Sequence, residues 1–333
     1  MYFGLSEDQV FFQDNVRKFL EDQAPLDAIR KIAEGNDSSS KDELYQGLIN
    51  LGINNLLIPE DNGGLGLDLL FAVAISQSLG AGIATLPFIG PYVMAPIAIK
   101  HAANEMQKNT LFEGMVNNSI NFSIGFSEYF GSRDSSGLTF SQNKVSGKTL
   151  FVLDGDYASH VMLCNKDGQI GVVSLDSAGI ETINLTTVDK TRMYQEMNFD
   201  NTPIEILENS LTSSNAIELS IDAGRIVAAA DSIGASQYMI DKAIEYSKER
   251  KQFNRVIGSF QAVKHMCAEM AADLEPCYSL VWHAAHSFDN HEADSRLMAC
   301  HAKSHVSEIS KIISKKATEV HGGMGFTDLL GLH

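Results

Sequence analysis

The sequence has few cysteines, a single tryptophan and no long apolar run. Its four cysteines are widely spaced, without a CxxC pair, a pattern that does not favour a disulfide framework or a zinc site. No apolar stretch approaches the roughly 20 residues that cross a bilayer. Residues 1–10 also lack the basic flank and apolar stretch of a signal peptide. We therefore expect a cytoplasmic protein that makes no membrane contact.

Basic residues are also scarce. The chain has 25 Lys and Arg against 42 Asp and Glu, a formal net charge of −17. Such a surface repels phosphate backbones, so nucleic acid is excluded as a partner class. One dense basic cluster stands out, formed by Lys248, Arg250, Lys251 and Arg255. It indicates either a site for a small anionic ligand or a solvated helix end.

The periodicity of apolar residues divides the 333 residues into three parts. Helical spacing predicts helices near 6–20, 42–51, 69–79, 92–102 and 104–116, and Ser6 with Gln9 resembles a capping box. From 119 to 210 short runs with a period of two predict an antiparallel sandwich or barrel. Long helices are then predicted over 215–250, 258–288 and 293–320. The expected fold class is α+β, with domains at 1–118, 119–210 and 211–333.

The most informative segment is IEYSKERKQFNRVIGSFQAVKHMCAEM, residues 244–270. A helix ends in a basic turn, a short loop follows, and a second helix starts near Phe260. Arg250 at a helix end offers donors suited to a phosphate or pyrophosphate. Gln252 and Gln261 can add amide hydrogen bonds, and Phe253 can add a stacking surface. The segment closely resembles the signature of the acyl-CoA dehydrogenase family, although Asn254 replaces the usual Gly.

Four further segments extend this resemblance over nearly the whole chain. They are LLIPEDNGGLGLD (56–68), GFSEYFGSRD (125–134), SGKTLFVLDGDYASHVML (146–163) and EVHGGMGF (319–326). The resemblance implies a helical domain, a β domain and a four-helix bundle, with FAD as cofactor. It implies flavin-dependent α,β-desaturation of an acyl-CoA thioester. Arg250, Gln252, Phe253 and Gln261 would then contact FAD, and Gly322 and Gly323 would let the backbone approach it.

Departures from the family pattern affect the flavin and the catalytic base. Phe151-Val152-Leu153 replaces the Trp-Ile-Thr that lies beside the flavin in the family, and Glu319 replaces a Gln that contacts the dinucleotide. The family's glutamate base directly precedes an arginine or lies beyond the GGxG turn. Here Gly224 precedes Arg225, and the sequence ends eight residues past Gly325. We therefore assign no catalytic residue, and we expect Asp222 to be an exposed helix carboxylate.

Two further stretches, GAGIATLPFIGPYVMAPIAI (80–99) and KTLFVLDG (148–155), resemble the shorter subunits of heteromeric acyl-CoA dehydrogenases that degrade sterol side chains and related bulky acids. The resemblance implies an acyl-CoA substrate, a second acyl-CoA dehydrogenase-like subunit in an α2β2 assembly, and electron-transfer flavoprotein or a similar acceptor. Two alternatives stay open: a self-sufficient homomeric dehydrogenase whose base is unrecognised, and a non-catalytic scaffold subunit. His301 and His305 have helical spacing but no acidic partner, so we expect no metal site.

Overall fold

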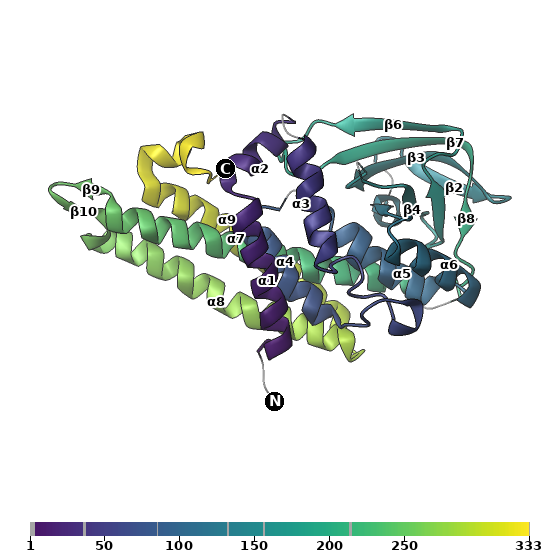
Figure 1. The fold of residues 1–333 in the computed structure, drawn as a ribbon, viewed down its shortest axis with the longest axis horizontal. Coiled ribbons are helices and arrows are strands. Elements are labelled where there is room, and N and C mark those ends of the chain that lie inside the picture. The colour runs from purple at the N-terminus through teal and green to yellow at the C-terminus, as the bar shows by residue number, and fades with distance from the viewer. Residues whose placement is uncertain are drawn as a thin grey trace. The chain divides into compact units, whose positions relative to one another are not determined.

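The computed structural model describes residues 4–35, 38–84, 86–131, 133–155, 157–212 and 215–332 (Figure 1). Ser132 and Asp156, which fall in two of the segments quoted above, and His333 lie outside these residues. The α-helices are α1 (Glu7–Gln23), α2 (Leu26–Ala33), α3 (Ser38–Asn50), α4 (Leu69–Ala81), α5 (Ala95–Ala102), α6 (Glu105–Val116), α7 (Ala216–Glu249), α8 (Gln261–Asp289) and α9 (Ser295–His321). A π-helical turn, η2 (Ile89–Met94), leads into α5.

The larger strands form one sheet and the last two form a hairpin. The strands are β1 (Phe122–Gly125), β2 (Gly137–Ser141), β3 (Lys144–Leu153), β4 (His160–Cys164), β5 (Ile170–Ser174), β6 (Ile180–Leu185), β7 (Tyr194–Pro203), β8 (Glu205–Ile206), β9 (Lys251–Gln252) and β10 (Arg255–Val256). Short 3₁₀ turns are η1 (Glu60–Asn62), η3 (Ser127–Phe130), η4 (Ile257–Ser259), η5 (Gly322–Phe326) and η6 (Asp328–Leu330).

The chain divides into two compact units, each built from separate stretches of sequence. The first comprises Met1–Arg30, Leu69–Ala84 and Arg225–His333, and the second comprises Lys31–Asp68 and Thr85–Gly224. Both units therefore draw on the amino-terminal region. The three-domain division at 118 and 210 stays a prediction about how the sequence is organised.

Helix α1 starts as its sequence predicts. Ser6 accepts a hydrogen bond from the backbone N–H of Gln9, and the Gln9 side chain accepts one from the Ser6 backbone, which completes the capping box. Val16 and Leu20 are buried and α1 packs against α4. Val10 and Phe11, predicted on the same apolar face, are exposed instead. Only part of the predicted stripe therefore faces the core.

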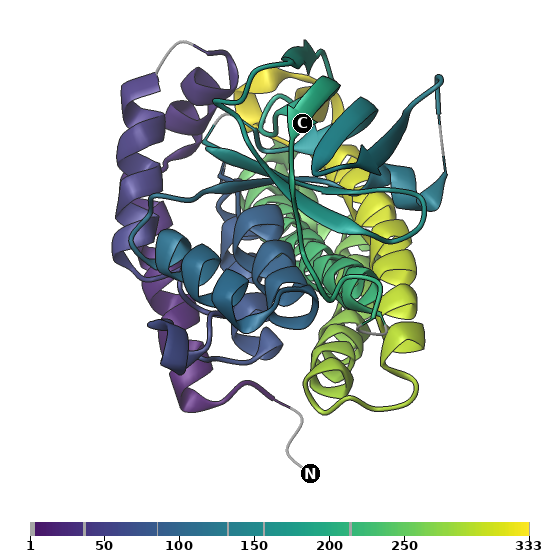
Figure 2. The same cartoon turned by 90° about the vertical axis from the view of Figure 1, so that its right-hand side faces the viewer.

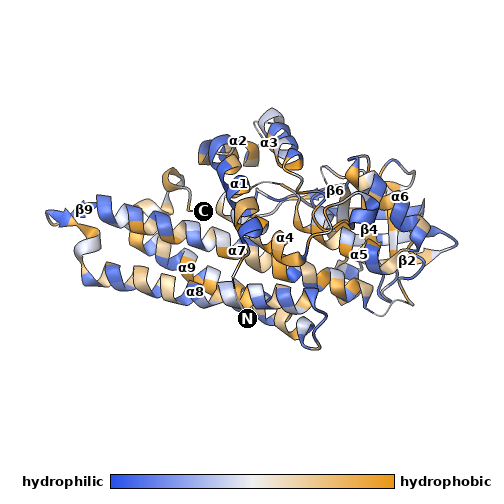
Figure 3. Cartoon of the chain, turned by 60° about the horizontal axis from the view of Figure 1, so that its bottom comes forward, coloured by the Kyte–Doolittle hydropathy of each residue, from blue (hydrophilic) through white to orange (hydrophobic). Residues whose placement is uncertain are grey.

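A four-helix bundle forms the core of the first unit. The segment 211–333 contributes three long helices close to the predicted bounds, α7, α8 and α9, and α4 is the fourth. Helix α4 is apolar nearly all round, as its orange colour in Figure 3 shows, and nearly all of it is buried. A Cβ on Gly234 would lie 1.9 Å from the Gln77 carbonyl oxygen, so α4 and α7 approach at backbone distance.

Polar contacts connect α7 to each of the other helices of the bundle. Ser76 Oγ on α4 donates to the Val227 carbonyl at 3.0 Å. Tyr278 on α8 donates to Gln237 at 3.3 Å, and the hydroxyls of Ser236 and Ser310 link α7 to α9 at 2.9 Å. Helix α7 therefore lies at the centre of this unit.

A mixed sheet forms the core of the second unit. Its order is β6-β7-β3-β1-β4-β5-β8, with β2 paired to β3. The predicted antiparallel pairing holds except between β1 and β4, which run parallel because the β2–β3 hairpin separates them in sequence. Met162 packs on the face covered by α5 and α6, blue in Figure 2, and Leu163 packs on the other face. Alternating side chains thus build two apolar layers on one sheet.

Candidate functional site

The basic turn after α7 folds into a tight hairpin. Strand β9 pairs antiparallel with β10, Gln252 opposite Arg255, and the Ile257 N–H donates to the Arg250 carbonyl at 2.8 Å. The two residues at its tip, Phe253 and Asn254, have φ values of +53° and +61°. Positive φ at both central positions is typical of a type I′ turn. The sequence predicts only a loop here, because Phe-Asn lacks the glycine that usually marks this turn.

The aromatic residue at the hairpin tip is held in a conformation that bulky side chains rarely adopt. Asn tolerates the left-handed region, so Asn254 can replace the family's Gly. Phe253 adopts the same left-handed region at a cost of roughly 1–2 kcal/mol. Its side chain is 87% exposed and meets Phe260 edge to face at 6.2 Å. The Arg255 guanidinium lies 3.9 Å from the centre of the Phe260 ring. A strained backbone that presents an exposed aromatic ring predicts that the ring contacts a ligand or another chain.

The hairpin, the start of α8 and the end of α9 border an open pocket of about 730 Å³. Five of the six predicted cofactor residues line it: Arg250, Gln252, Phe253, Gly322 and Gly323. Gln261 does not; it is the first residue of α8, directly after Phe260. Sequence reasoning missed the remaining wall, formed by Tyr246, Ile257, Phe260, Ala262, Val263, Val320, His321 and Met324. Helical spacing back from the predicted residues could have found Tyr246 and Val320.

This pocket combines an available cation, open backbone and aromatic walls. The Arg250 side chain has no hydrogen bond or ion pair within the described residues. A Cβ on Gly322 or Gly323 would meet no atom within 4 Å, so the backbone there is open to a ligand. Tyr246 stacks near the buried His321, with ring centres 4.5 Å apart. The residues present therefore fit a diphosphate attached to an aromatic base, as in the adenine half of FAD.

Glu319 bears less directly on this pocket than the sequence suggests. It is exposed on the last turn of α9, and it does not line the cavity. The carboxylate that replaces the family's Gln therefore adds negative charge beside the pocket, where water screens it. We expect its effect on an anionic ligand to be small.

The second unit contains the segments that lie beside the flavin in the family. Phe151 is 47% exposed, has a φ of +56°, and lines a small cavity of about 180 Å³ with Arg133 and Phe130. No hydroxyl stands at Leu153 to replace the family's threonine. The substitutions at 151–153 therefore remove a hydrogen-bond donor from this place and keep only an aromatic ring.

A buried carboxylate also lines this cavity. Glu128 is 2% exposed. It accepts hydrogen bonds from the Thr149 hydroxyl at 2.5 Å and the Leu150 N–H at 3.0 Å. The Ser127 hydroxyl lies 3.0 Å from the carboxylate and 2.6 Å from the Leu150 carbonyl, which share its one proton. These hydrogen bonds join η3 to β3, so Glu128 positions this segment.

The space beside Gly224, one of the two places where the family resemblance would put a glutamate, holds another side chain. A Cβ on Gly224 would lie 2.8 Å from the Met94 sulfur and 3.0 Å from its Cγ. Ser220 fixes the adjoining backbone by donating to the Met94 carbonyl at 2.7 Å. Asp222, expected to be exposed, is instead buried, with 4% of its surface exposed. That expectation was wrong because α7 is covered on both faces where it begins.

His301 and His305 are both exposed on α9. Within the part of the chain that the structure describes, no three His, Cys, Asp or Glu side chains gather as a metal site would require. No described helix combines the length and apolar character needed to cross a membrane.

Comparison with known proteins identifies the family. Residues 6–119 match the model of the acyl-CoA dehydrogenase amino-terminal domain, and residues 214–333 match that of the carboxyl-terminal domain. The chain therefore belongs to the acyl-CoA dehydrogenase family, whose members are FAD-dependent oxidoreductases.

Three relatives show how far the similarity extends. The caffeyl-CoA reductase-Etf complex subunit CarC of Acetobacterium woodii is 27% identical, over 98% of this chain and 90% of its own length. A variant of the Tcur3481-Tcur3483 steroid ACAD has a TM-score of 0.85 and 25% identity, over 98% of this chain and 90% of that one. Butyryl-CoA dehydrogenase from Megasphaera elsdenii shares the fold, with a TM-score of 0.84 and 20% identity over 98% and 91% of the two chains.

Proposed function

We propose that this chain is the subunit without the catalytic base in a heteromeric, FAD-dependent acyl-CoA dehydrogenase. The complex would desaturate an acyl-CoA thioester between Cα and Cβ, with the base supplied by a second chain of the same family. When bound, FAD accepts the hydride that leaves Cβ as a base removes the proton from Cα. This chain would contribute Arg250, Gln252, Phe253, Gly322 and Gly323 to FAD held across the subunit interface, with Gln261 nearby.

The observation that carries this proposal is the contrast between Gly224 and the pocket after α7. Met94 lies against Gly224, in the space that a glutamate there would need. Five residues with the chemistry of a dinucleotide site nevertheless lie together around the pocket of about 730 Å³. A chain with these cofactor candidates, and with Met94 beside Gly224 where a glutamate would stand, fits a subunit that depends on a partner.

Each of these residues would have a distinct task. The fixed fork of the Arg250 guanidinium matches two phosphate oxygens, and its charge offsets theirs. Phe253, exposed at the hairpin tip, would cover a flat ring, while Gln252 would donate an amide hydrogen bond. Open backbone at Gly322 and Gly323 would let the cofactor lie close to the end of α9.

The relatives support the remaining parts of the proposal. One solved relative is named as a steroid enzyme made of two proteins, and CarC is named as part of a complex with Etf. We therefore propose an α2β2 assembly in the cytoplasm, a bulky acyl-CoA of the steroid side-chain type as substrate, and electron-transfer flavoprotein or a similar protein as acceptor. The net charge of −17 supports a function without nucleic acid.

Purification of the chain alone and with its partner tests the proposal. An affinity-tagged chain should co-purify with a second acyl-CoA dehydrogenase-like chain, identified by mass spectrometry. The complex should show the flavin absorption spectrum, and its flavin should become reduced when acyl-CoA is added. The chain alone should carry little flavin and show no turnover.

The two alternatives predict different results in the same experiment. A homomeric dehydrogenase would carry one FAD per chain and turn over without a partner, which would overturn the proposal. A non-catalytic scaffold would leave the FAD content of the partner unchanged when it joins the complex. Under our proposal, FAD binding instead requires both chains and weakens in the complex when Arg250 is substituted.

A further inference from the structure

A second cavity in the first unit lies far along α7 from the hairpin. It measures about 720 Å³, and residues of α1, α4, α7 and α8 line it. Its walls mix apolar side chains with amides, hydroxyls and one indole: Leu5, Val10, Gln13, Arg17, Gln77, Ser78, Ala81, Gln237, Glu275, Tyr278, Ser279 and Trp282, with Gly4 and Gly234. None of the cofactor residues proposed above is among them.

A chain of hydrogen bonds fixes the orientation of one amide in this cavity. Gln13 Nε2 donates to the Ala74 carbonyl at 3.0 Å, which sets the orientation of the Gln13 amide. The same nitrogen donates to Gln77 Oε1 at 2.9 Å, which sets the orientation of the Gln77 amide. Gln77 is 6% exposed, and its Nε2 has no partner among the described residues. Gln77 therefore presents a buried N–H₂ group that reversing the amide would not satisfy.

A second donor in the same cavity is also without a partner. The indole nitrogen of Trp282 is buried and forms no hydrogen bond with any described residue. An indole N–H can only donate, so it requires an acceptor. The neighbouring Tyr278 does not supply one by ionising, because burial raises its pKa to about 12 and its hydroxyl donates to Gln237. Gln77 and Trp282, which each carry an unpartnered donor, thus both line this cavity.

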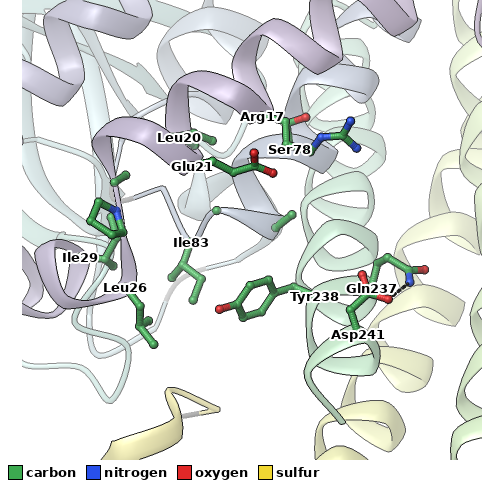
Figure 4. Close-up of a pocket in the computed structure, with 14 residues that line it drawn as sticks. Arg17, Leu20, Glu21, Leu26, Ile29, Ser78, Ile83, Gln237, Tyr238 and Asp241 are labelled. Atoms are coloured by element: carbon green, nitrogen blue, oxygen red, sulfur yellow. Dashed lines mark hydrogen bonds between the residues drawn. The ribbon is translucent and has the colours of Figure 1, made fainter. Parts of the chain in front are cut away.

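An adjacent pocket of about 550 Å³, drawn in Figure 4, provides a contrast. The Tyr238 ring extends there from α7 toward Leu26 and Ile83 (Figure 4). The polar groups that this pocket shares with the larger cavity have partners. Gln237 donates to Asp241 at 2.9 Å, and Ser78 donates to the Gln13 carbonyl at 3.0 Å. Unpartnered donors therefore distinguish the larger cavity from its neighbour.

The charges around the larger cavity favour a neutral acceptor over an anion. Arg17 is the one cation in its lining, and it pairs with Asp14 at 2.6 Å. Glu275 adds a negative charge to the same wall. A carboxylate would give up its hydration without a free cation to replace it, whereas a neutral carbonyl needs only the two N–H donors.

We propose that this cavity binds a small apolar molecule that carries a neutral carbonyl, such as an amide, ketone or ester. Gln77 Nε2 and Trp282 Nε1 donate to the carbonyl oxygen. Leu5, Val10 and Ala81 contact the apolar body. Because no residue of the FAD pocket takes part, this site is independent of the proposed dehydrogenase function.

The single tryptophan makes the site directly measurable. The purified chain, alone or in its complex, is titrated with three probes of similar shape: N,N-dimethylcyclohexanecarboxamide, cyclohexanecarboxylate and N,N-dimethylcyclohexanemethylamine. The readout is Trp282 emission, because Trp282 is the only tryptophan in this chain. In the complex, a parallel titration with Trp282→Phe measures the emission of the partner alone, which is then subtracted. We expect a saturable change with the amide, and binding at least about tenfold tighter than for the carboxylate or the amine.

Variants at Gln77 test whether the probe binds where proposed. Gln77→Glu keeps an acceptor for Gln13 but replaces the free donor with an acceptor, so amide binding should weaken about tenfold or more. Gln77→Met removes the donor without adding charge and covers the case in which Gln77→Glu fails to fold. Gln23→Glu makes the same chemical change at an exposed position outside the cavity and should have no effect.

Three results would overturn the proposal. The first is no saturable change with any probe at millimolar concentration, which would indicate a cavity that holds only water. The second is tighter binding of the carboxylate than of the amide, which would indicate an anion site. The third is amide binding that both Gln77 variants leave unchanged, which would place the probe elsewhere.

Discussion

The hairpin pocket of the first unit keeps more of the family's functional residues than the second unit does around Glu128 and around Gly224. Around the hairpin, a free arginine, an exposed aromatic ring and two open glycines border one cavity. In the second unit Leu153 stands where the family has a threonine hydroxyl beside the flavin, and Met94 packs against Gly224. The buried Glu128 is kept, but its hydrogen bonds serve the fold. Under the proposed function, cofactor contact and catalysis are therefore separable within one chain.

Replacing the buried carboxylate of the second unit should have the largest effect. Glu128→Ala leaves the Leu150 N–H and the Thr149 hydroxyl buried without an acceptor, and we expect a loss of about 2–5 kcal/mol of stability. Urea unfolding followed by circular dichroism measures it. Glu128→Gln, which keeps the volume and one acceptor, should lose less. Equal losses for the two variants would show that shape, rather than hydrogen bonding, makes Glu128 necessary.

Removing the guanidinium of the hairpin pocket should leave stability unchanged and reduce FAD binding. A charged hydrogen bond contributes roughly 1.5–3 kcal/mol, so Arg250→Met should raise the Kd for FAD in the complex about 10- to 100-fold. Fluorescence titration of the flavin measures the change. Lys251→Met removes the same charge from the same hairpin without touching the pocket and is the control. Similar losses of FAD affinity for both variants would show that Arg250 contributes only its positive charge and makes no specific contact with FAD.

Placing a glutamate at position 224 tests how tightly Met94 packs there. Gly224→Glu alone should lose about 1–3 kcal/mol, because the new side chain overlaps the Met94 thioether. Gly224→Glu combined with Met94→Ala should recover most of that loss, as thermal unfolding would show. If the single variant is as stable as the parent chain, Met94 moves aside easily and does not block the base.

Relaxing the hairpin tip should separate stability from binding. Phe253→Gly removes the left-handed strain but also the ring, so the melting temperature should stay the same or rise while FAD binding weakens. Asn254→Gly relaxes the neighbouring residue and should change neither property by more than a few tenths of a kcal/mol. A fall in stability with Phe253→Gly would mean that its contact with Phe260 outweighs the strain.

Thiol labelling should report on each unit separately. Burial raises the pKa of Cys277 in the first unit to about 11, and burial together with the Glu128 charge raises the pKa of Cys164 in the second unit. Because thiolates react and thiols do not, both should label slowly at pH 8 and faster as the pH rises toward 11. In Glu128→Ala, Cys164 should label faster while Cys277 stays protected. Mass spectrometry after N-ethylmaleimide treatment distinguishes the two sites.

Local signals in the sequence predicted much of the first unit. The Ser6–Gln9 capping box and the long apolar periodicity after residue 215 are local patterns, and α1, α7, α8 and α9 follow them. Five cofactor candidates also meet in one pocket, since the matched segments are short and continuous. That α4 is the fourth helix of the bundle could not be predicted, because packing between distant segments leaves no local pattern.

The features that escaped prediction depend on contacts between distant residues. The parallel pairing of β1 with β4 follows from the order of the whole sheet, which a period of two does not specify. The contact between Met94 and Gly224 joins segments more than a hundred residues apart, and the burial of Asp222 nearby depends on how α7 packs. At Phe253 the hairpin formed against local preference, because Phe-Asn is not a sequence that favours positive φ.

The methionine beside Gly224 has a consequence for how this chain could change over time. Under the proposed function, a glutamate introduced at 224 meets the Met94 sulfur first, so a chain that gained a base there would also have to move or replace Met94, at a cost in stability. Selection acts on each step separately and would disfavour that route. If such a chain depends on a partner subunit for its base, the packing of Met94 against Gly224 makes that dependence harder to lose.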